Sequence, residues 1–370
     1  MNEGSGMNIP VIDLSGSPYE IGLTHGKTCK TSIINNLSYY LGLWNHYSGV
    51  KRNKVLDDVQ LFLPFIEKID KELIEEMKGV ATGASLKFEE VLALNARWEL
   101  NYAYLFPAPI KESGSGCTAI AITADRSKNK NLLMGQNWDY KPGLKNNCIV
   151  LRIYQQNKPK IIIHTEAGII GHKGINSSGI GICMNYIRCE KDTFKPGLPV
   201  WLKVRSLLNS DTLPQCLRIL MNNIGPNSAN IMIGHRDGEV IDAECTPNDV
   251  YFIYPTSGIL THSNHFLSQK LRVIDSGKNL LPDTVIRSER AWRLLDRNSV
   301  NTIENMKSIL KDHFGFPEAI CRHENPKMDT YAQWVTLTSL VYNLKKGEFY
   351  YTSGEPCQGN YKKLSFKEKN

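Results

Sequence analysis

The Gly-Cys junction at 116–117 is the one place where a thiol of this chain could attack its own backbone. The segment Gly114-Ser115-Gly116-Cys117-Thr118 joins a helical first third to the first strong strand pattern. Glycines leave the backbone free to take unusual angles, so the thiol of Cys117 could reach the carbonyl of Gly116. Such an attack moves the acyl group from nitrogen to sulfur. Hydrolysis of the resulting thioester leaves Cys117 with a free α-amine.

The α-amine of such a cysteine is suited to act as the base for its own thiol. An N-terminal amine has a pKa of roughly 7.7–8.0, whereas a lysine has one near about 10.4. The amine therefore accepts a proton near neutral pH, as it does in threonine-amine nucleophiles. The competing interpretation of Cys117 is a buried cysteine that begins a strand and serves packing alone.

The composition is that of an ordinary globular protein. Of the 370 residues, 41% are hydrophobic and 22% are charged. We find no apolar run of about 18 residues and no signal-peptide pattern at the start, so neither a membrane span nor export is expected. The net charge of +7 is spread thinly, and no recognised nucleic-acid-binding module accompanies it. We expect a cytoplasmic protein with no nucleic-acid or membrane partner.

The nine cysteines predict neither a disulfide framework nor a metal site. Their number is odd, and no C-x-x-C pair occurs. His262 and His265 invite a metal interpretation, but two histidines at a strand end have poor ligand geometry, and no cysteine or acidic residue is spaced to help. We expect structural histidines and no bound metal.

The first third of the chain is predicted to be helical. A capping box, Ser17-Pro18-Tyr19-Glu20, starts a long amphipathic segment. Further helices fit 55–79 and 86–100. In the last of these, Arg97 and Glu99 are two positions apart and cannot share a face, so we expect one of them to pack inward.

The remainder predicts strands in two groups, separated by helices at 199–221 and 284–313. From Cys117 onward, short apolar runs alternate with turn residues, as strands do. This order favours a layered α+β architecture, and the absence of repeats or linkers favours one compact domain from about 10 to 355. The tail after 361 looks like a solvated basic terminus. The predicted strands are 117–124, 131–138, 148–154, 159–165, 179–185, 230–235, 239–245, 249–255, 334–343 and 348–354.

Several segments match one known family. GCT at 116–118 is followed by GQNWD at 135–139 and HTEAGIIG at 164–171, with HSNH at 262–265 and ICR at 320–322 further on. With these segments the chain resembles the isopenicillin-N N-acyltransferase (acyl-coenzyme A:6-aminopenicillanate acyltransferase) family of N-terminal-nucleophile (Ntn) hydrolases, whose relatives include β-alanyl-amine hydrolases. The resemblance implies a four-layer αββα sandwich with a helical N-terminal segment. It also implies autocatalytic cleavage into fragments 1–116 and 117–370, which together form one compact domain.

The resemblance also assigns roles to single residues. Cys117 becomes the nucleophile and, after cleavage behind Gly116, the new N-terminus. Asp139 would hold and orient the α-ammonium, since a buried carboxylate needs such a partner. Asn264 is the oxyanion-hole asparagine, and one such donor is typically worth about 2.7–4 kcal/mol. On sequence alone, Asp139 fits a turn residue equally well.

Three further assignments rest on weaker parallels. The backbone N–H of Tyr186 would supply a second oxyanion donor. Arg322 would place a cation near the site, although a surface ion pair explains it almost as well. Ser228 would lie near the processing site.

The implied reaction is acyl transfer from an amide or thioester through a Cys117 thioester. The partners are a small-molecule amide or acyl donor and an acceptor, which is water or an amine. Acyl-coenzyme A is a possible co-substrate, and no cofactor is needed. Two alternatives remain: a narrower hydrolase of β-alanyl or other aminoacyl amines, and a non-enzymatic relative that uses the fold as a binding module.

Overall fold

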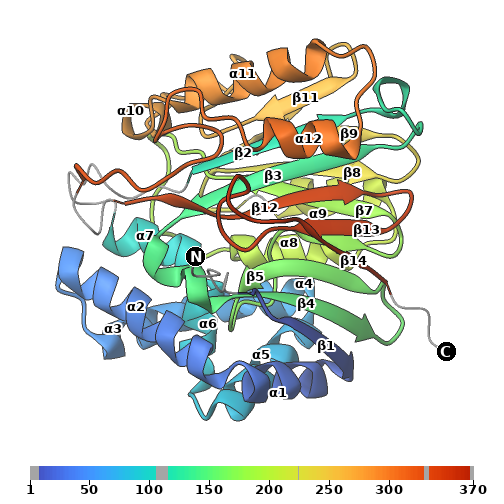
Figure 1. Ribbon diagram of the computed structural model, residues 1–370. Coiled ribbons are helices and arrows are strands. Elements are labelled where there is room, and N and C mark those ends of the chain that lie inside the picture. Colours follow the sequence, from blue (N-terminus) through green and yellow to red (C-terminus); the bar gives the residue numbers. More distant parts are fainter. Residues whose placement is uncertain (1–7, 106–115, 224, 329–332, 367–370) are drawn as a thin grey trace, which may run out of the picture.

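Two β-sheets lie face to face between layers of helices in the computed structural model, which describes residues 8–105, 116–223, 225–328 and 333–366 (Figure 1). Helices α8 and α9 contact the eight-stranded sheet, and α11 and α12 contact the six-stranded sheet. Strand β7 of the first sheet contacts β2 and β3 of the second. The layers therefore run helix, sheet, sheet, helix, which confirms the αββα architecture and the α+β class.

The two sheets contain fourteen strands in the part of the chain that the structure describes. The eight-stranded sheet has, in spatial order, β1 (Val11–Gly16), β4 (Cys148–Gln155), β5 (Ile161–Glu166), β6 (Gly174–Asn176), β7 (Ile180–Asn185), β8 (Ala229–His235), β9 (Val240–Cys245) and β10 (Val250–Ile253). The six-stranded sheet has β11 (Ile259–His262), β2 (Gly116–Ile122), β3 (Leu133–Tyr140), β12 (Val335–Asn343), β13 (Glu348–Tyr351) and β14 (Lys362–Ser365). Every residue of β2 and β3 is buried, because both faces of that sheet are covered.

The helices form two groups along the chain. The N-terminal group is α1 (Pro18–Thr28), α2 (Lys30–Ser48), α3 (Arg52–Asp58), α4 (Leu63–Ile69), α5 (Lys71–Ala84), α6 (Phe88–Asn95) and α7 (Arg97–Tyr104). The later group is α8 (Val200–Leu208), α9 (Leu213–Asn222), α10 (Gly277–Leu280), α11 (Thr284–Asp296) and α12 (Ile303–Ile309). The capping box at Ser17 is present as predicted, with both reciprocal hydrogen bonds to Glu20. In the described ranges, no helix combines the length and apolar character that crossing a membrane requires.

Helices α1 and α5 cross with their backbones almost in contact. A Cβ atom at Gly22 would lie 1.9 Å from the Glu76 carbonyl oxygen, and one at Gly79 would lie 2.1 Å from the Tyr19 carbonyl oxygen. Glycine is therefore required on both helices at this crossing. This close packing on α5 helps to hold α1 in place beside β1, which α1 also contacts.

Four strands and several helix breaks differ from the sequence prediction. Strands β1, β6, β11 and β14 were not predicted; the last three have only three or four residues, and β14, with the sequence KKLS, resembles a solvated tail. A charged strand at a sheet edge is a common way to prevent edge pairing with other chains. The helical segments expected at 55–79, 86–100, 199–221 and 284–313 each contain more than one helix. In the last of them, α11 ends at Asp296, and Thr302 caps α12 separately.

One of Arg97 and Glu99 was expected to pack inward, and the structure shows that both do. Both side chains are buried, because α7 lies between the N-terminal helices and α8. Arg97 forms an ion pair with Glu166 of β5, and Glu99 accepts a hydrogen bond from the backbone nitrogen of Val200 at 2.8 Å. A helix that is covered on two sides can bury polar groups on both, provided that each finds a partner.

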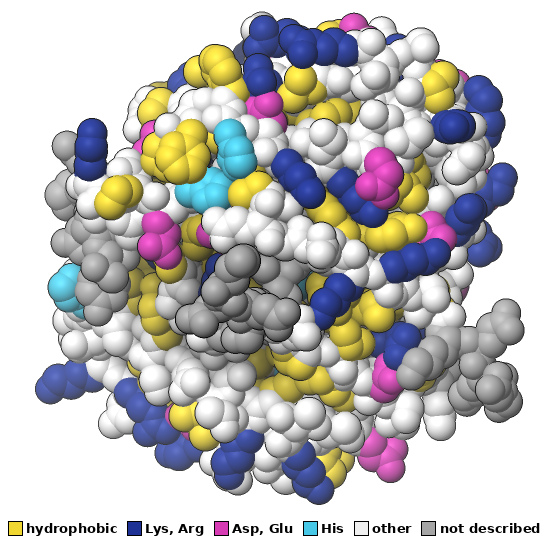
Figure 2. Space-filling view, in the orientation of Figure 1, with side chains coloured by type: hydrophobic (Ala, Val, Ile, Leu, Met, Phe, Trp, Pro, Cys, Tyr) yellow, Lys and Arg dark blue, Asp and Glu magenta, His cyan; other side chains and the backbone are white. Residues whose placement is uncertain are grey.

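Charge is spread over the surface. On the face drawn in Figure 2, Lys and Arg side chains lie around the molecule with acidic and hydrophobic side chains among them. This arrangement agrees with the thin distribution of the net charge of +7 along the chain.

Candidate active site

Cys117 lies near the start of β2, between β3 and β11, and is almost completely buried. Its backbone nitrogen donates to Oδ1 of Asn264 at 2.8 Å. Its carbonyl oxygen accepts from Nη1 of Arg287 at 2.7 Å and from Nδ2 of Asn185 at 3.2 Å. Burial raises the pKa of the thiol to about 11, although the positive charge of Lys173 opposes that rise. The backbone on both sides of the thiol is thus fixed by side chains from three other elements.

Asp139 stands directly opposite Gly116 in the β2–β3 pairing. Oδ1 of Asp139 accepts a hydrogen bond from Thr336 at 2.7 Å, and Oδ2 lies 3.5 Å from Nε of Arg322. A Cβ atom at position 116 would lie 2.7 Å from Oδ2 of Asp139, so only glycine fits there. Burial raises the pKa of the Asp139 carboxyl, and the charges of Arg322 and Arg287 oppose that rise. The carboxylate is therefore packed against the residue whose carbonyl a Cys117 thiol would attack.

Asn264 follows β11 and is completely buried beside Cys117. Its Oδ1 accepts from Cys117 and also from Nη2 of Arg287 at 2.9 Å. Its Nδ2 donates to the carbonyl oxygen of Tyr186 at 2.8 Å, which uses one of the two N–H groups of the amide. Asn264 thus holds the nitrogen of Cys117 and keeps one N–H group for a further acceptor.

Arg287 and Asp283 complete the ion-pair network of the site. Arg287 is buried, donates to Oγ1 of Thr118 at 2.9 Å, and pairs with Asp283 at 2.6 Å. Asp283 also pairs with Arg322, which in turn faces Asp139. Arg322, which the sequence predicts near the site, lies beside Asp139, and its role there stays a prediction. Arg287 was not predicted.

The roles predicted for Tyr186 and Ser228 stay predictions. The carbonyl oxygen of Tyr186 accepts the hydrogen bond from Asn264, and the Tyr186 ring packs against Trp98 at a centroid distance of 5.5 Å. The hydroxyl of Ser228 lies 3.4 Å from Sγ of Cys189, and its backbone nitrogen donates to Asp192. These contacts place Ser228 beside Cys189 and Asp192.

His262 and His265 both form hydrogen bonds to protein groups. His262 bonds to Glu244 at 2.9 Å and to the backbone carbonyl of Ser263 at 2.9 Å. Nδ1 of His265 lies 3.0 Å from the hydroxyl of Thr284. Such contacts fit the structural role expected for these histidines.

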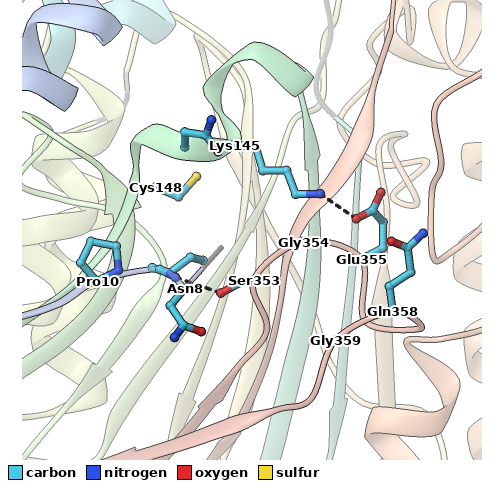
Figure 3. Close-up of a pocket in the computed structure, with 11 residues that line it drawn as sticks. Asn8, Pro10, Lys145, Cys148, Ser353, Gly354, Glu355, Gln358 and Gly359 are labelled. Atoms are coloured by element: carbon cyan, nitrogen blue, oxygen red, sulfur yellow. Dashed lines mark hydrogen bonds and ion pairs between the residues drawn. The ribbon is translucent and has the colours of Figure 1, made fainter. Parts of the chain in front are cut away.

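Two cavities have walls that are formed partly by residues after position 279. The smaller, of about 130 Å³, has Asp283, Arg322 and Trp334 in its wall and therefore adjoins the ion-pair network. The larger, of about 400 Å³, lies between residues 8–10 and the turn at 353–359 (Figure 3). Figure 3 shows the ion pair between Lys145 and Glu355, 3.0 Å long, beside it. The smaller cavity shares residues with the site, and so does a third cavity, of about 180 Å³, which has Asp283 and Arg287 in its wall.

Several known proteins are similar to this chain in sequence. The family model for acyl-coenzyme A:6-aminopenicillanic acid acyl-transferase matches residues 126–358. The chain belongs to this family. The acyl-coenzyme A:6-aminopenicillanic-acid-acyltransferase (40 kDa form) of Emericella nidulans is 31% identical over 324 residues, which cover 84% of each chain. This membership confirms the expectation of an enzyme that transfers acyl groups or hydrolyses amides.

Other relatives are more distant. The protein dcd1A of Dictyostelium discoideum is 22% identical over 58% of this chain and 53% of its own. Among solved structures, the penicillin V acylase from Agrobacterium tumefaciens matches with 12% identity and a TM-score of 0.44, covering 64% of this chain and 83% of that one. A mutant form of the conjugated bile acid hydrolase from Clostridium perfringens matches with 15% identity and a TM-score of 0.44, covering 68% of this chain and 97% of that one.

Lys173 is a buried cation near Cys117 that the sequence analysis did not single out. Its Nζ lies 4.6 Å from the ring centroid of Trp138 and 5.8 Å from that of Trp201. Burial lowers the pKa of Lys173 to about 8, and its charge lowers the pKa of the Cys117 thiol. The positive charge of Lys173 is therefore one means of favouring the thiolate of Cys117.

Replacing Lys173 by methionine is expected to raise the pKa of the Cys117 thiol, because a nearby positive charge is lost. The acid limb of the pH profile of kcat/KM should then move to higher pH, and a tenfold loss of thiolate at a fixed pH corresponds to a rise of about 1 in that pKa. Lys203→Met is the matched control. Lys203 is also buried, but its charge interacts with Glu99 and Cys245. An unchanged acid limb in Lys173→Met would show that the lysine does not influence the thiol.

Proposed function

We propose that this chain is a self-processing cysteine amidohydrolase or acyltransferase of the Ntn type, with Cys117 as nucleophile. One observation carries the proposal. The nitrogen of Cys117 is held by Oδ1 of Asn264, while Gly116, on the other side of the same peptide bond, is packed against Asp139. The groups that the reaction needs thus surround a single peptide bond.

In the processing step, the Cys117 thiolate attacks the carbonyl carbon of Gly116. The C–N bond breaks, the nitrogen takes up a proton, and a thioester joins Gly116 to the cysteine sulfur. Water then hydrolyses the thioester, which releases a carboxylate at Gly116 and restores the thiol. The new α-amine has Asn264 as a hydrogen-bond acceptor and the Asp139 carboxylate near by.

In the catalytic step, the same thiolate attacks the carbonyl of an acyl donor. In this proposal the remaining N–H group of Asn264 donates to the oxyanion, and the α-ammonium gives its proton to the leaving amine. A thioester then links the acyl group to Cys117, and water or an acceptor amine takes that group. For a thioester donor such as acyl-coenzyme A, the leaving group is a thiol.

The fragments 1–116 and 117–370 are proposed to stay together after cleavage as one compact domain. Strand β1 from the first fragment pairs in parallel with β4 from the second. Buried ion pairs join Arg97 to Glu166 and Glu76 to Arg205 across the same boundary. Removing one partner of a buried ion pair typically costs about 3–5 kcal/mol, so separation of the fragments would be costly.

The proposed substrate class is inferred from the substrates that the relatives are named for. The Emericella nidulans enzyme is named for acyl-coenzyme A and 6-aminopenicillanic acid. For this chain we propose a small acyl donor, amide or thioester, with water or an amine as acceptor.

The acyl-enzyme offers a direct test. Wild-type protein is mixed with acyl-coenzyme A or with amides that include β-alanyl amines, quenched in acid, and analysed by intact mass spectrometry. One acyl adduct is expected on fragment 117–370, on the peptide that begins with Cys117. A Cys183→Ala variant should give the same adduct, since Cys183 is a buried cysteine of β7. Turnover without an adduct on Cys117 would contradict the proposed nucleophile.

A further inference from the structure

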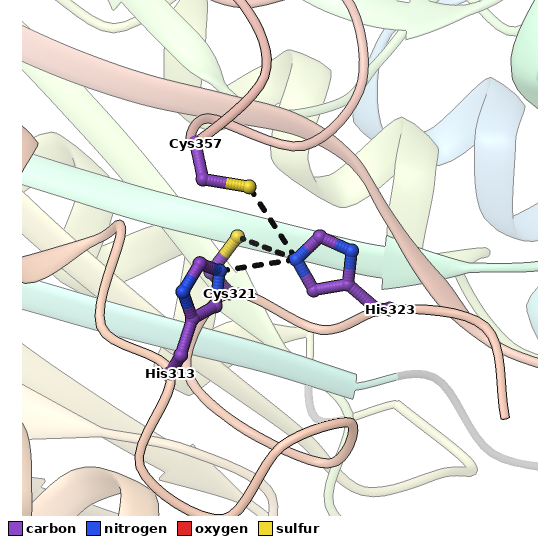
Figure 4. Close-up of side chains that lie close together, drawn as sticks. All are labelled: His313, Cys321, His323 and Cys357. Atoms are coloured by element: carbon purple, nitrogen blue, oxygen red, sulfur yellow. Dashed lines mark hydrogen bonds between the residues drawn. The ribbon is translucent and has the colours of Figure 1, made fainter.

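Four side chains of metal-binding type meet near the loop that follows α12. His313, Cys321, His323 and Cys357 each offer one ligand atom, and these atoms all lie within 4.8 Å of one another. Figure 4 shows the four side chains pointing toward a common centre. Nε2 of His323 lies 3.1 Å from Nε2 of His313, 3.6 Å from Sγ of Cys321 and 3.4 Å from Sγ of Cys357.

Hydrogen bonding alone does not account for this cluster. A single imidazole nitrogen donates one proton or accepts at one lone pair, so Nε2 of His323 cannot satisfy three partners at once. In tetrahedral zinc sites the bonds are about 2.3 Å to sulfur and about 2.0–2.1 Å to nitrogen, which places sulfur and nitrogen ligands about 3.5 Å apart and two nitrogens about 3.3 Å apart. The separations of 3.1, 3.4 and 3.6 Å agree with that geometry.

We propose that His313, Cys321, His323 and Cys357 bind one structural zinc ion. The ligand set is Cys2His2, which is typical of closed, four-coordinate structural sites. On binding, both thiols release their protons to solvent, and the two thiolates balance the charge of Zn²⁺ while both imidazoles stay neutral. All four positions are taken by protein atoms, so the ion serves structure rather than the acyl-transfer chemistry.

No metal was expected from the sequence, because these residues lack a recognised spacing. Cys321 and His323 are separated by one residue, and Cys357 lies 34 positions beyond His323. Strands β12 and β13 intervene, and their hairpin returns the chain to the loop after α12. Only the folded chain brings the two segments together.

The proposed ion is positioned to support the candidate active site. Arg322 lies between two of the ligands, and its backbone nitrogen donates to the hydroxyl of Thr336 at 2.9 Å. That hydroxyl donates in turn to Asp139 at 2.7 Å, and the side chain of Arg322 faces Asp139 and Asp283. Zinc would therefore fix the segment that positions the Asp139 carboxylate.

Metal content tests the proposal without reference to activity. Purified wild-type protein is expected to contain about one zinc per chain by plasma mass spectrometry. After removal of zinc with a chelator, addition of Co²⁺ should give the absorption bands of a tetrahedral thiolate centre. The thermal midpoint should fall on chelation and recover with zinc.

Variants identify the ligands. Cys357→Ser and His313→Gln should each lower zinc affinity at least tenfold and weaken the cobalt bands. The control variants are Cys29→Ser and His46→Gln, and both should keep full zinc. Cys29 is a buried cysteine between α1 and α2, and His46 is exposed, as His313 is. Because His313 is exposed, its variant is expected to fold. Zinc-free wild-type protein that takes up neither zinc nor cobalt, or that holds a Cys321–Cys357 disulfide, would overturn the proposal.

Discussion

Replacement of Cys117 by alanine is expected to abolish cleavage of the chain. Wild-type protein should separate on a denaturing gel into fragments 1–116 and 117–370, and N-terminal sequencing of the larger should read Cys-Thr-Ala. The variant should run as one intact chain, because alanine has no group that can attack the carbonyl of Gly116. Acyl transfer should vanish with cleavage, since nucleophile and base are lost together.

Two controls separate this chemical effect from a folding defect. Cys183→Ala removes a thiol that is equally buried in the facing strand β7, and it should still be cleaved. Circular dichroism should show that the uncleaved Cys117→Ala chain is folded. If wild-type protein remains whole and is active, the α-amine cannot be the base.

The hairpin that carries Cys117 and Asp139 is the part of the site that sequence patterns predict best. Two apolar runs around a polar turn predict paired strands, and the observed register places Gly116 opposite Asp139. The position of Asn264 is a different case. It depends on β11, a strand of four residues with no clear pattern, so only the family resemblance drew attention to it.

Arg287, Lys173 and Asn185 could not be recognised from the sequence as site residues. Arg287 lies on α11 among other charged residues, and only the packing of α11 on β2 and β11 buries it. Lysine is rarely buried, so nothing in the segment around Lys173 predicted its position between two tryptophans. Asn185 ends β7, and it meets Cys117 only because the two sheets face each other. Contacts between layers are set by tertiary packing, which local patterns do not encode.

Asn264→Asp is expected to separate the two tasks proposed for Asn264. Aspartate keeps an oxygen to accept from the nitrogen of Cys117 and to pair with Arg287, but it has no N–H group. The Tyr186 carbonyl loses its donor, and the developing oxyanion meets a carboxylate. Loss of one oxyanion donor typically lowers kcat by about 10²–10³-fold, so a fall of at least that size is expected with KM little changed.

The measurement is steady-state turnover of the donor that labels Cys117, together with the thermal midpoint. Asn36→Asp is the matched control, because Asn36 is fully buried and also donates through Nδ2 to a backbone carbonyl, that of Ala167, at 2.8 Å. Both variants bury a new carboxyl group, so both should lose stability, whereas only Asn264→Asp should lose kcat. Equal kcat in the two variants would mean that the amide of Asn264 holds the cysteine nitrogen without stabilising the oxyanion. The donor would then have to be sought among the backbone N–H groups around Cys117.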